Sequence, residues 1–172
     1  MANNNLFLTG MMGSGKSTVG GLIAKKTGWK FLDTDEFIEQ RAGMPVAKIF
    51  EKKGEAEFRN LEHQTIKRVS EAQHQVVALG GGALILESNQ ILVSKSGTLV
   101  YLSAKVETLL ERLGTDLSAR PLLKDENEAW IKAKVSQLLH NREAIYMLAR
   151  FKVSTDGKTP EEVANEIISL MT

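Results

Sequence analysis

The stretch Gly10-Met11-Met12-Gly13-Ser14-Gly15-Lys16-Ser17 matches the pattern G-x-x-x-x-G-K-[ST], the signature of a phosphate-binding loop. Its glycines let backbone N–H groups close around a polyphosphate. The apolar run Asn5–Thr9 before it predicts a buried strand. Residues 16–27 after it have apolar positions at helical spacing and are followed by Gly28, a common helix stop. A strand, a glycine loop and a helix form the context that this motif requires.

A helix that begins at Lys16 points its first N–H groups and the positive end of its dipole at bound phosphates. We expect the Lys16 side chain to reach the outer phosphates and the Ser17 hydroxyl to bind Mg²⁺. The alternative is a glycine-rich turn between a strand and a helix that binds no ligand. The flanking strand and helix favour the phosphate-binding interpretation.

Length and charge narrow the class of protein. The chain has 172 residues, which predicts one domain over residues 1–172. Its 22 basic and 21 acidic residues give a net charge of +1, which argues against binding nucleic acid or a membrane surface through charge. The lack of cysteine excludes disulfides and thiolate metal sites.

The sequence has no signal-peptide pattern and no apolar run of about 20 residues. We therefore expect a cytoplasmic protein and a monomer.

Apolar patterning predicts the remaining elements. Short apolar runs predict strands at residues 30–33, 75–79, 98–102 and 151–153. Helical spacing predicts helices near residues 36–42, 46–53, 55–72, 85–93, 105–113, 128–148 and 160–171. Residues 114–127 are polar and aperiodic, and loops of this length are commonly lids or disordered. Strands that alternate with helices predict an α/β fold with a parallel sheet covered on both faces.

Three chemically distinctive segments directly follow predicted strands. They are the phosphate-binding loop, the acidic segment Asp33–Asp35 and the glycines Gly80–Gly82. Because ligands of open α/β sheets bind at the carboxyl ends of the strands, we expect these segments to converge on one crevice. Gly80–Gly82 can either allow a close backbone approach to a ligand or form a tight turn, and the sequence favours neither.

Asp33 and Asp35 are two residues apart, so both carboxylates face one side if the strand geometry persists through them. Phosphoryl transfer uses one acid to help to hold Mg²⁺ and another to accept or orient the proton of the attacking hydroxyl. The alternative is that one of these residues caps the helix that begins near Glu36. The nearby phosphate-binding loop favours the catalytic interpretation.

Arg59, Arg120 and Arg142 are candidates for binding an anion, because the planar guanidinium fork holds two oxygens at once. Arg120 lies in the aperiodic loop, from which it could swing onto a transferring phosphoryl group as that loop closes. Taken singly, each arginine is more often a solvated surface residue.

Missing motifs narrow the class of nucleotide-binding protein. No D-x-x-G follows the phosphate-binding loop, and N-K-x-D and T-K-x-D do not occur. These absences argue against a guanine-selective switch protein. The third predicted strand ends in glycine, where motor-type ATPases place an acid. The acids follow the second strand instead, and this arrangement is similar to that of kinases that act on small molecules.

The chain resembles the shikimate kinase family over nearly its whole length. The matching segments occur in this order: Gly10–Ser17, Asp33-Thr34-Asp35, Gly54-Glu55-Ala56-Glu57-Phe58-Arg59, Gly80-Gly81-Gly82, Arg120-Pro121-Leu122-Leu123, and Arg142 with Tyr146 four residues later. Each segment is modest alone, whereas the set in this order and spacing is highly specific.

The resemblance implies a three-layer P-loop kinase fold of the nucleoside-monophosphate-kinase type, with a parallel sheet in the order 2-3-1-4-5. It implies a substrate-binding segment at about residues 33–62 and a mobile lid at about residues 114–126. It also implies that ATP and Mg²⁺ are used to phosphorylate the 3-hydroxyl of shikimate, which gives shikimate 3-phosphate and ADP on the way to chorismate and the aromatic amino acids.

The resemblance also implies roles for single residues at the nucleotide end of the site. Ser17 and Asp33 would serve Mg²⁺, and Arg120 would stabilise charge on the γ-phosphoryl group. Arg112 resembles the arginine that stacks on adenine, with residues 154–160 on the other side. The implied nucleotide-binding residues are Gly13, Ser14, Gly15, Lys16, Ser17, Thr18, Arg112 and Arg120.

At the acceptor end, the resemblance implies that Asp35 binds the reacting hydroxyl and acts as the base or stands in for it. Arg59 and Arg142 would hold the substrate carboxylate, and Gly81 or Gly82 would donate a backbone N–H to a hydroxyl. Phe50 and Phe58 would pack near the carbocycle. The implied catalytic residues are Asp35, Lys16 and Arg120.

Two alternatives remain open from the sequence. A kinase of the same fold could act on gluconate or on a nucleoside monophosphate, although the set Asp35, Arg59 and Arg142 favours an acceptor with one carboxylate and several hydroxyls. A regulator could bind nucleotide without turnover, although the presence of Lys16, Asp33, Asp35 and Arg120 argues against it.

Overall fold

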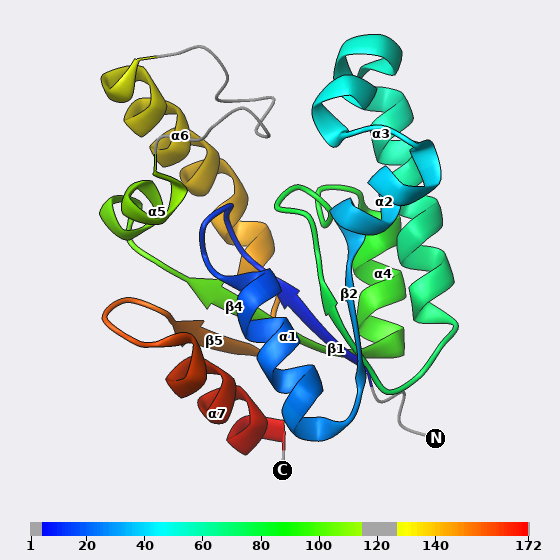
Figure 1. The fold of residues 1–172 in the computed structure, drawn as a ribbon, viewed down its shortest axis with the longest axis vertical. Helices are drawn as coiled ribbons and strands as arrows, with labels where there is room; N and C mark the ends of the chain where they lie inside the picture. Colours follow the sequence, from blue (N-terminus) through cyan, green and yellow to red (C-terminus); the bar gives the residue numbers. More distant parts are fainter. Residues whose placement is uncertain (1–4, 115–126, 172) are drawn as a thin grey trace.

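A five-stranded parallel sheet forms the centre of the computed structural model, which describes residues 5–114 and 127–171 (Figure 1). Its strands are β1 (Asn5–Thr9), β2 (Lys30–Asp33), β3 (Gln75–Ala78), β4 (Gly97–Ser103) and β5 (Phe151–Ser154). They lie in the order β2-β3-β1-β4-β5, and each neighbouring pair is parallel. The fold predicted from the sequence is therefore confirmed.

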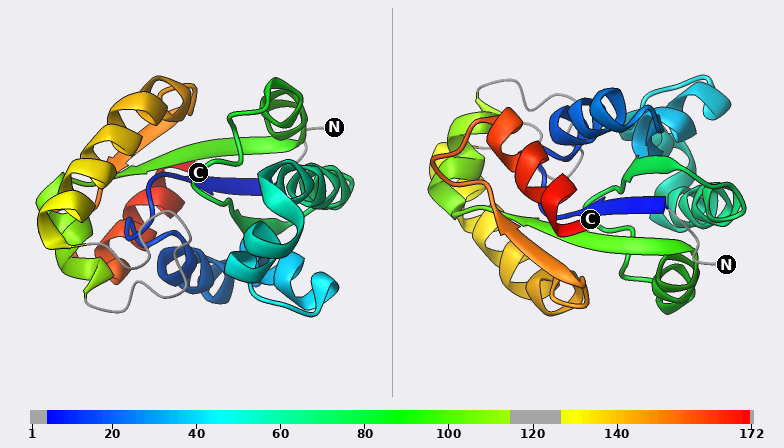
Figure 2. Two further views of the ribbon diagram at one scale, coloured as in Figure 1. Left: turned by 90° about the horizontal axis from the view of Figure 1, so that it is seen from above. Right: turned by 90° about the horizontal axis from the view of Figure 1, so that it is seen from below.

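Helices cover both faces of the sheet (Figure 2). Within the described ranges they are α1 (Lys16–Thr27), α2 (Thr34–Ala42), α3 (Val46–Ser70), α4 (Glu87–Ser96), α5 (Val106–Leu113), α6 (Glu128–Tyr146) and α7 (Pro160–Met171). Side chains of α1 and α7 pack on one face, and side chains of α3 and α4 pack on the other. The result is the three-layer arrangement that near-continuously apolar strands require.

β1 lies in the middle of the sheet and is buried along its whole length. Its side chains alternate between the two faces. Leu6 and Leu8 join the apolar cluster under α1 and α7, whereas Phe7 joins the cluster under α3 and α4. This anchoring fixes the carboxyl end of β1, where the phosphate-binding loop begins.

α3 bends at Gly54, whose dihedral angles (φ 83°, ψ 169°) are not helical. The sequence predicted two helices that meet at this glycine, and the structure confirms the break. The bend lets the first part of α3 fold back towards α2. Ile38 from α2 and Ile49 and Phe58 from α3 form a separate small core there. Helices α2 and α3 thus form their own packed unit beside the sheet.

Two further predictions from the sequence concern a lid and membrane-spanning helices. The predicted lid, residues 114–126, lies outside the described residues apart from Gly114. In the part of the chain that the structure describes, no helix is both long and apolar enough to cross a bilayer.

Candidate active site

The phosphate-binding loop joins β1 to α1 and is held against β4. A Cβ atom built on Gly10 would lie 2.5 Å from the carbonyl oxygen of Leu102, so a side chain cannot fit at this position. The Lys16 ammonium group donates hydrogen bonds to the carbonyl oxygens of Gly10 (2.9 Å) and Met11 (3.0 Å). These contacts hold the lysine side chain over the phosphate-binding loop.

Asp33 links the acidic segment to the phosphate-binding loop. Its Oδ1 accepts hydrogen bonds from the backbone N–H groups of Asp35 (2.9 Å) and Glu36 (3.3 Å), which makes it the N-cap of α2. Its Oδ2 accepts a hydrogen bond from the Ser17 hydroxyl at 2.5 Å. The helix-capping alternative and the proposed metal role are therefore compatible, because each uses a different oxygen.

The predicted strand geometry of Asp33 and Asp35 is wrong. β2 ends at Asp33, and Thr34 and Asp35 belong to the first turn of α2. The physical reason is the cap itself, because the Asp33 carboxylate binds the first N–H groups of α2 and starts the helix earlier than the apolar pattern suggested. Asp35 nevertheless lines the same cavity as the phosphate-binding loop.

Gly80 begins a tight turn that carboxylates approach closely. The turn is closed by the N–H group of Ala83, which donates to the carbonyl oxygen of Gly80 at 3.0 Å. A Cβ atom at Gly80 would lie 2.8 Å from Asp35 Oδ1 and 3.0 Å from Glu62 Oε1. The structure confirms the tight turn, and a close approach of the glycines to a ligand stays a prediction.

Gly81 and Gly82 make room for two guanidinium groups. A Cβ atom at Gly81 would lie 3.4 Å from Nη1 of Arg142, and one at Gly82 would lie 2.7 Å from Nη2 of Arg59. Arg142 comes from α6 and is 8% exposed, whereas Arg59 comes from α3. The glycine turn (Gly80–Gly82) therefore lies against both arginines, as well as against the carboxylates.

Glu62 was not identified from the sequence. Its Oε2 accepts a hydrogen bond from Nη1 of Arg59 at 2.8 Å, and its side chain is 1% exposed. Among the residues that the structure describes, its Oε1 has no hydrogen-bond partner. Burial raises the pKa of the Glu62 carboxyl, although the Arg59 charge opposes this. The available signal was its position three residues after Arg59 on a helix, where opposite charges pair.

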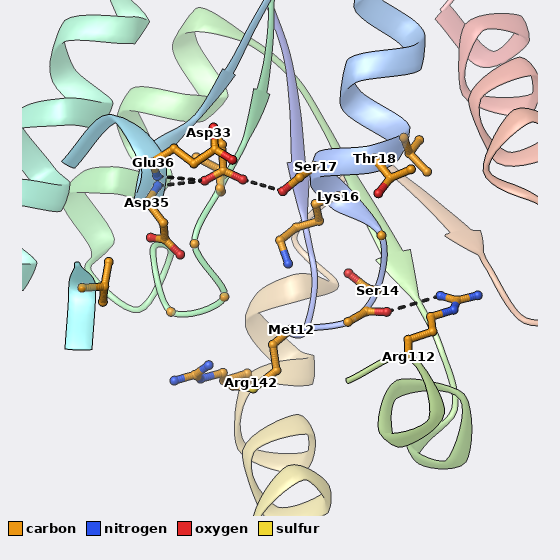
Figure 3. A pocket seen from close by; sticks show the side chains of 18 of the residues that line it. Met12, Ser14, Lys16, Ser17, Thr18, Asp33, Asp35, Glu36, Arg112 and Arg142 are labelled. Atoms are coloured by element: carbon orange, nitrogen blue, oxygen red, sulfur yellow. Dashed lines mark hydrogen bonds between the residues drawn. The ribbon is translucent and has the colours of Figure 1, made fainter. Parts of the chain in front are cut away.

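Arg112 lies at the opposite end of the site from Asp35. Its guanidinium group donates to the Thr155 side-chain and main-chain oxygens, both at 2.8 Å, and to the Gly13 carbonyl oxygen at 3.4 Å. It therefore connects α5 to the loop before α7 and to the phosphate-binding loop, and Figure 3 shows the second of these links. Lys158 and Pro160 line the cavity beside these residues.

One cavity of about 790 Å³ joins these parts. Figure 3 shows Asp35, Lys16 and Arg142 reaching into it from α2, the start of α1 and α6. The sequence-predicted residues that line it are Gly13, Ser14, Gly15, Lys16, Ser17, Thr18, Asp33, Asp35, Phe50, Phe58, Arg59, Gly81, Gly82, Arg112 and Arg142. Arg120 lies outside the described residues.

The oxygens of Ser17 and Asp33 suit Mg²⁺ better than a metal ion that is coordinated by protein ligands alone. Within residues 5–114 and 127–171 there is no group of three or more His, Cys, Asp or Glu side chains that could hold a metal ion. Mg²⁺ bound with a nucleotide takes one or two protein oxygens, with phosphates and water as the other ligands. The adjacent oxygens of Ser17 and Asp33 fit this requirement.

The fold and the cavity define a P-loop kinase of a small molecule. A phosphate-binding loop at the centre of the sheet shares its cavity with the carboxylate of Asp35 and the guanidinium groups of Arg59 and Arg142. The family model "Shikimate kinase" matches residues 12–172, and the chain belongs to the shikimate kinase family. The enzyme class and the resemblance predicted from the sequence are confirmed.

Individual relatives agree with this assignment. The chain is 43% identical to a shikimate kinase of Chlorobium luteolum, over 96% of this chain and 86% of the relative. It is 36% identical to the solved structure of shikimate kinase from Acinetobacter baumannii in complex with shikimate, with a TM-score of 0.92 and coverage of 98% and 92%. A gluconokinase from Sinorhizobium meliloti shares the fold alone, at 16% identity and a TM-score of 0.62, with coverage of 97% and 90%.

Proposed function

We propose that this enzyme transfers the γ-phosphoryl group of ATP to the 3-hydroxyl of shikimate, which yields shikimate 3-phosphate and ADP. The observation that carries the proposal is the cavity in which Lys16, Asp35, Arg59 and Arg142 meet around one glycine turn. An acceptor with one carboxylate and several hydroxyls needs a bidentate cation and neighbouring hydrogen-bonding groups. The acceptor end of this cavity offers both.

The nucleotide end of the cavity would bind ATP through backbone and side-chain donors. The N–H groups at the start of α1 and the positive end of its dipole favour the phosphates. Lys16 would exchange its carbonyl partners in the loop for phosphate oxygens. Arg112, already fixed by Thr155, would lie against the adenine, with Pro160 on the wall of the same pocket.

Ser17 and Asp33 would hold Mg²⁺. The bound ion would supply positive charge that offsets the charge developing on the phosphates during transfer. Asp33 keeps its second oxygen on the N-terminus of α2, so its carboxylate is oriented before any ligand binds.

The acceptor end would position the ring alcohol for attack. Arg59 and Arg142 would bind the substrate carboxylate, while Gly81 or Gly82 would donate an N–H group to a hydroxyl. The rings of Phe50 and Phe58, whose centroids are 4.8 Å apart, would pack against the carbocycle. Binding of this kind accelerates transfer by placing the reacting oxygen in line with the phosphorus atom.

Asp35 would accept the proton of the 3-hydroxyl as that oxygen attacks the γ-phosphorus. The new O–P bond forms while the bond from the γ-phosphorus to the bridging oxygen of ADP breaks. Arg120 would add positive charge to the transferring group from the predicted lid. Both roles are part of the proposal, as are a monomeric state, a cytoplasmic location and the lack of nucleic-acid and membrane partners.

A panel of acceptors in an assay coupled to ADP release tests the proposal. We expect ADP to form with shikimate and not with gluconate or CMP. ADP formation with gluconate or CMP, while shikimate stays inert, would favour a different kinase of the same fold. Tight binding of ATP and shikimate by calorimetry without any product would favour a regulator that has lost turnover.

A further inference from the structure

The glycine turn is attached to the rest of the protein by two hydroxyl groups. The backbone N–H of Gly80 donates to Oγ1 of Thr34 at 3.0 Å. The hydroxyl of Tyr146 donates to the carbonyl oxygen of Gly81 at 2.6 Å. Thr34 is 0% exposed and Tyr146 is 1% exposed, so water does not compete for either hydrogen bond.

These two hydroxyls belong to elements that carry groups of the proposed acceptor site. Thr34 lies between Asp33 and Asp35 at the start of α2. Tyr146 lies one helical turn after Arg142 on α6. The turn is thus attached on one side to the helix of the proposed base and on the other to the helix of a proposed carboxylate-binding arginine.

The Tyr146 side chain is itself held rigidly. Its ring packs against the ring of Tyr101 with centroids 5.1 Å apart, and its hydroxyl lies 3.6 Å from the sulfur of Met11 in the phosphate-binding loop. Burial raises the pKa of the Tyr146 hydroxyl, although the charge of Arg142 and its hydrogen bond to this hydroxyl oppose the rise. A fixed donor on a buried helix end can set the position of a loop carbonyl to a fraction of an ångström.

The turn needs such support because neighbouring charges crowd it. Asp35 and Glu62 lie against Gly80, while Arg142 and Arg59 lie against Gly81 and Gly82. A shift of the turn would move its N–H groups relative to every one of these side chains. Apolar packing flanks the turn, at Leu79 before it and at Ala83 and Leu84 after it, and leaves the glycines themselves to the polar contacts.

We propose that Thr34 and Tyr146 are positioning residues, which fix the glycine turn between Asp35 and Arg142 so that it presents its N–H groups to the acceptor. This inference rests on the proposed function and extends it to two residues that do not touch the acceptor. On this inference, Thr34 and Tyr146 affect the binding of the acceptor and not the binding of the nucleotide. Although the Tyr146 hydroxyl also lies 3.6 Å from the Met11 sulfur, the phosphate-binding loop is held separately by its contacts with β4 and with Lys16.

Steady-state kinetics of single variants test the inference. Tyr146→Phe and Thr34→Val each remove one hydroxyl with little change in shape. We expect each to raise the KM for shikimate about tenfold, since a buried group loses its hydrogen-bond partner. The KM for ATP should stay within about twofold. Thr34→Ser retains the hydroxyl and should restore the KM for shikimate.

Tyr101→Phe is the matched control, because it makes the same change in the ring that packs on Tyr146. We expect it to leave both KM values within about twofold, whatever it does to thermal stability. In the double variant of Thr34→Val and Tyr146→Phe, the KM for shikimate should rise by less than the product of the two single increases, because both residues act on one turn.

The outcomes separate the inference from the proposed function. Wild-type enzyme that does not phosphorylate shikimate would overturn both. Active wild-type enzyme whose Tyr146→Phe and Thr34→Val variants keep the KM for shikimate, or raise both KM values equally, would overturn the inference alone. If Thr34→Val does not fold, the inference is tested by comparing the KM for shikimate of Tyr146→Phe with that of Tyr101→Phe.

Discussion

Glu62 shows how a single buried carboxylate links the stability of this protein to pH. Burial raises its pKa above the ordinary value of 4.5, Arg59 and Arg142 oppose the rise, and Asp35 adds to it. A carboxyl group whose pKa is higher in the folded protein binds more protons there than in the unfolded chain. Its ionisation therefore lowers the free energy of unfolding as the pH rises above about 4.5.

Replacing Glu62 by glutamine removes this titration. Relative to Glu62→Gln, the free energy of unfolding of the wild type should fall as the pH rises from about 4.5 towards the raised pKa of the folded protein. Urea unfolding of both proteins at several pH values measures the difference. A difference that does not change with pH would contradict the assignment.

In the proposed mechanism, the chemical step depends most on Asp35. The variant Asp35→Asn keeps the shape of the side chain and removes the proton acceptor beside the proposed hydroxyl. We expect turnover to fall by at least about 10²-fold, which is the lower range for a general acid–base residue. ATP affinity, measured by calorimetry, should be nearly unchanged. A variant with the wild-type rate would refute the role.

Arg142 is expected to act on the acceptor and not on the nucleotide. Arg142→Ala removes a buried guanidinium group from the wall of the cavity. The KM for shikimate should rise at least about tenfold, because hydrogen bonds to charged groups are among the stronger ones. Arg150→Ala, which changes an exposed arginine just beyond α6, is the control. A change confined to the KM for ATP would speak against the assignment.

Among the elements, the glycine turn and the bend in α3 shape the proposed acceptor side of the cavity. Gly54 breaks α3 so that its first part folds against α2, and the Phe50 and Phe58 rings lie on the two sides of the break. The second part of α3 then places Arg59 against Gly82. The arginine is thus positioned by a helix with its own packed core.

A methyl group at Gly82 tests this contact. It would lie 2.7 Å from the guanidinium group of Arg59, so the side chain must move aside. We expect Gly82→Ala to raise the KM for shikimate with little loss of stability, because the obstructing atoms are the far end of a flexible side chain. Gly21→Ala in α1 is the control, since a Cβ there meets nothing within 4 Å and should stabilise the helix. Equal kinetics in the two variants would contradict the expectation.

Sequence patterns predicted the elements well where glycine or proline marks their ends. α1 ends before Gly28, α2 before Gly43, and α7 begins at Pro160, all as expected. The start of α2 was placed too late, because the Asp33 cap adds a turn that apolar spacing does not record. α4 begins at Glu87 and not at Ile85, since residues 83–86 continue the turn that follows β3.

At the scale of the whole molecule, the fold brings distant segments to one cavity. Residues of α1 and α5 line its proposed nucleotide end, and residues of α2, α3 and α6 line its proposed acceptor end. The sequence predicted the convergence of the phosphate-binding loop, Asp33–Asp35 and Gly80–Gly82, because each of these segments directly follows a strand and ligands bind at the carboxyl ends of parallel strands.

The contacts that fix the cavity were harder to predict. Thr34 and Gly80 are 46 residues apart, and Tyr146 and Gly81 are 65 residues apart, so no local pattern links them. A threonine or tyrosine on an apolar helix face looks like an ordinary core residue until its partner is known. Their roles became visible only when the tertiary structure placed a backbone group opposite each hydroxyl.

The most direct test of the central claim is the structure of the product. Phosphorus-31 and carbon-13 NMR of a reaction with ATP, Mg²⁺ and shikimate should show one new phosphate ester, on oxygen 3 of the ring, formed in step with ADP. A phosphate on another ring oxygen, or release of inorganic phosphate with shikimate unchanged, would contradict the claim that this cavity holds the 3-hydroxyl in line with the γ-phosphoryl group.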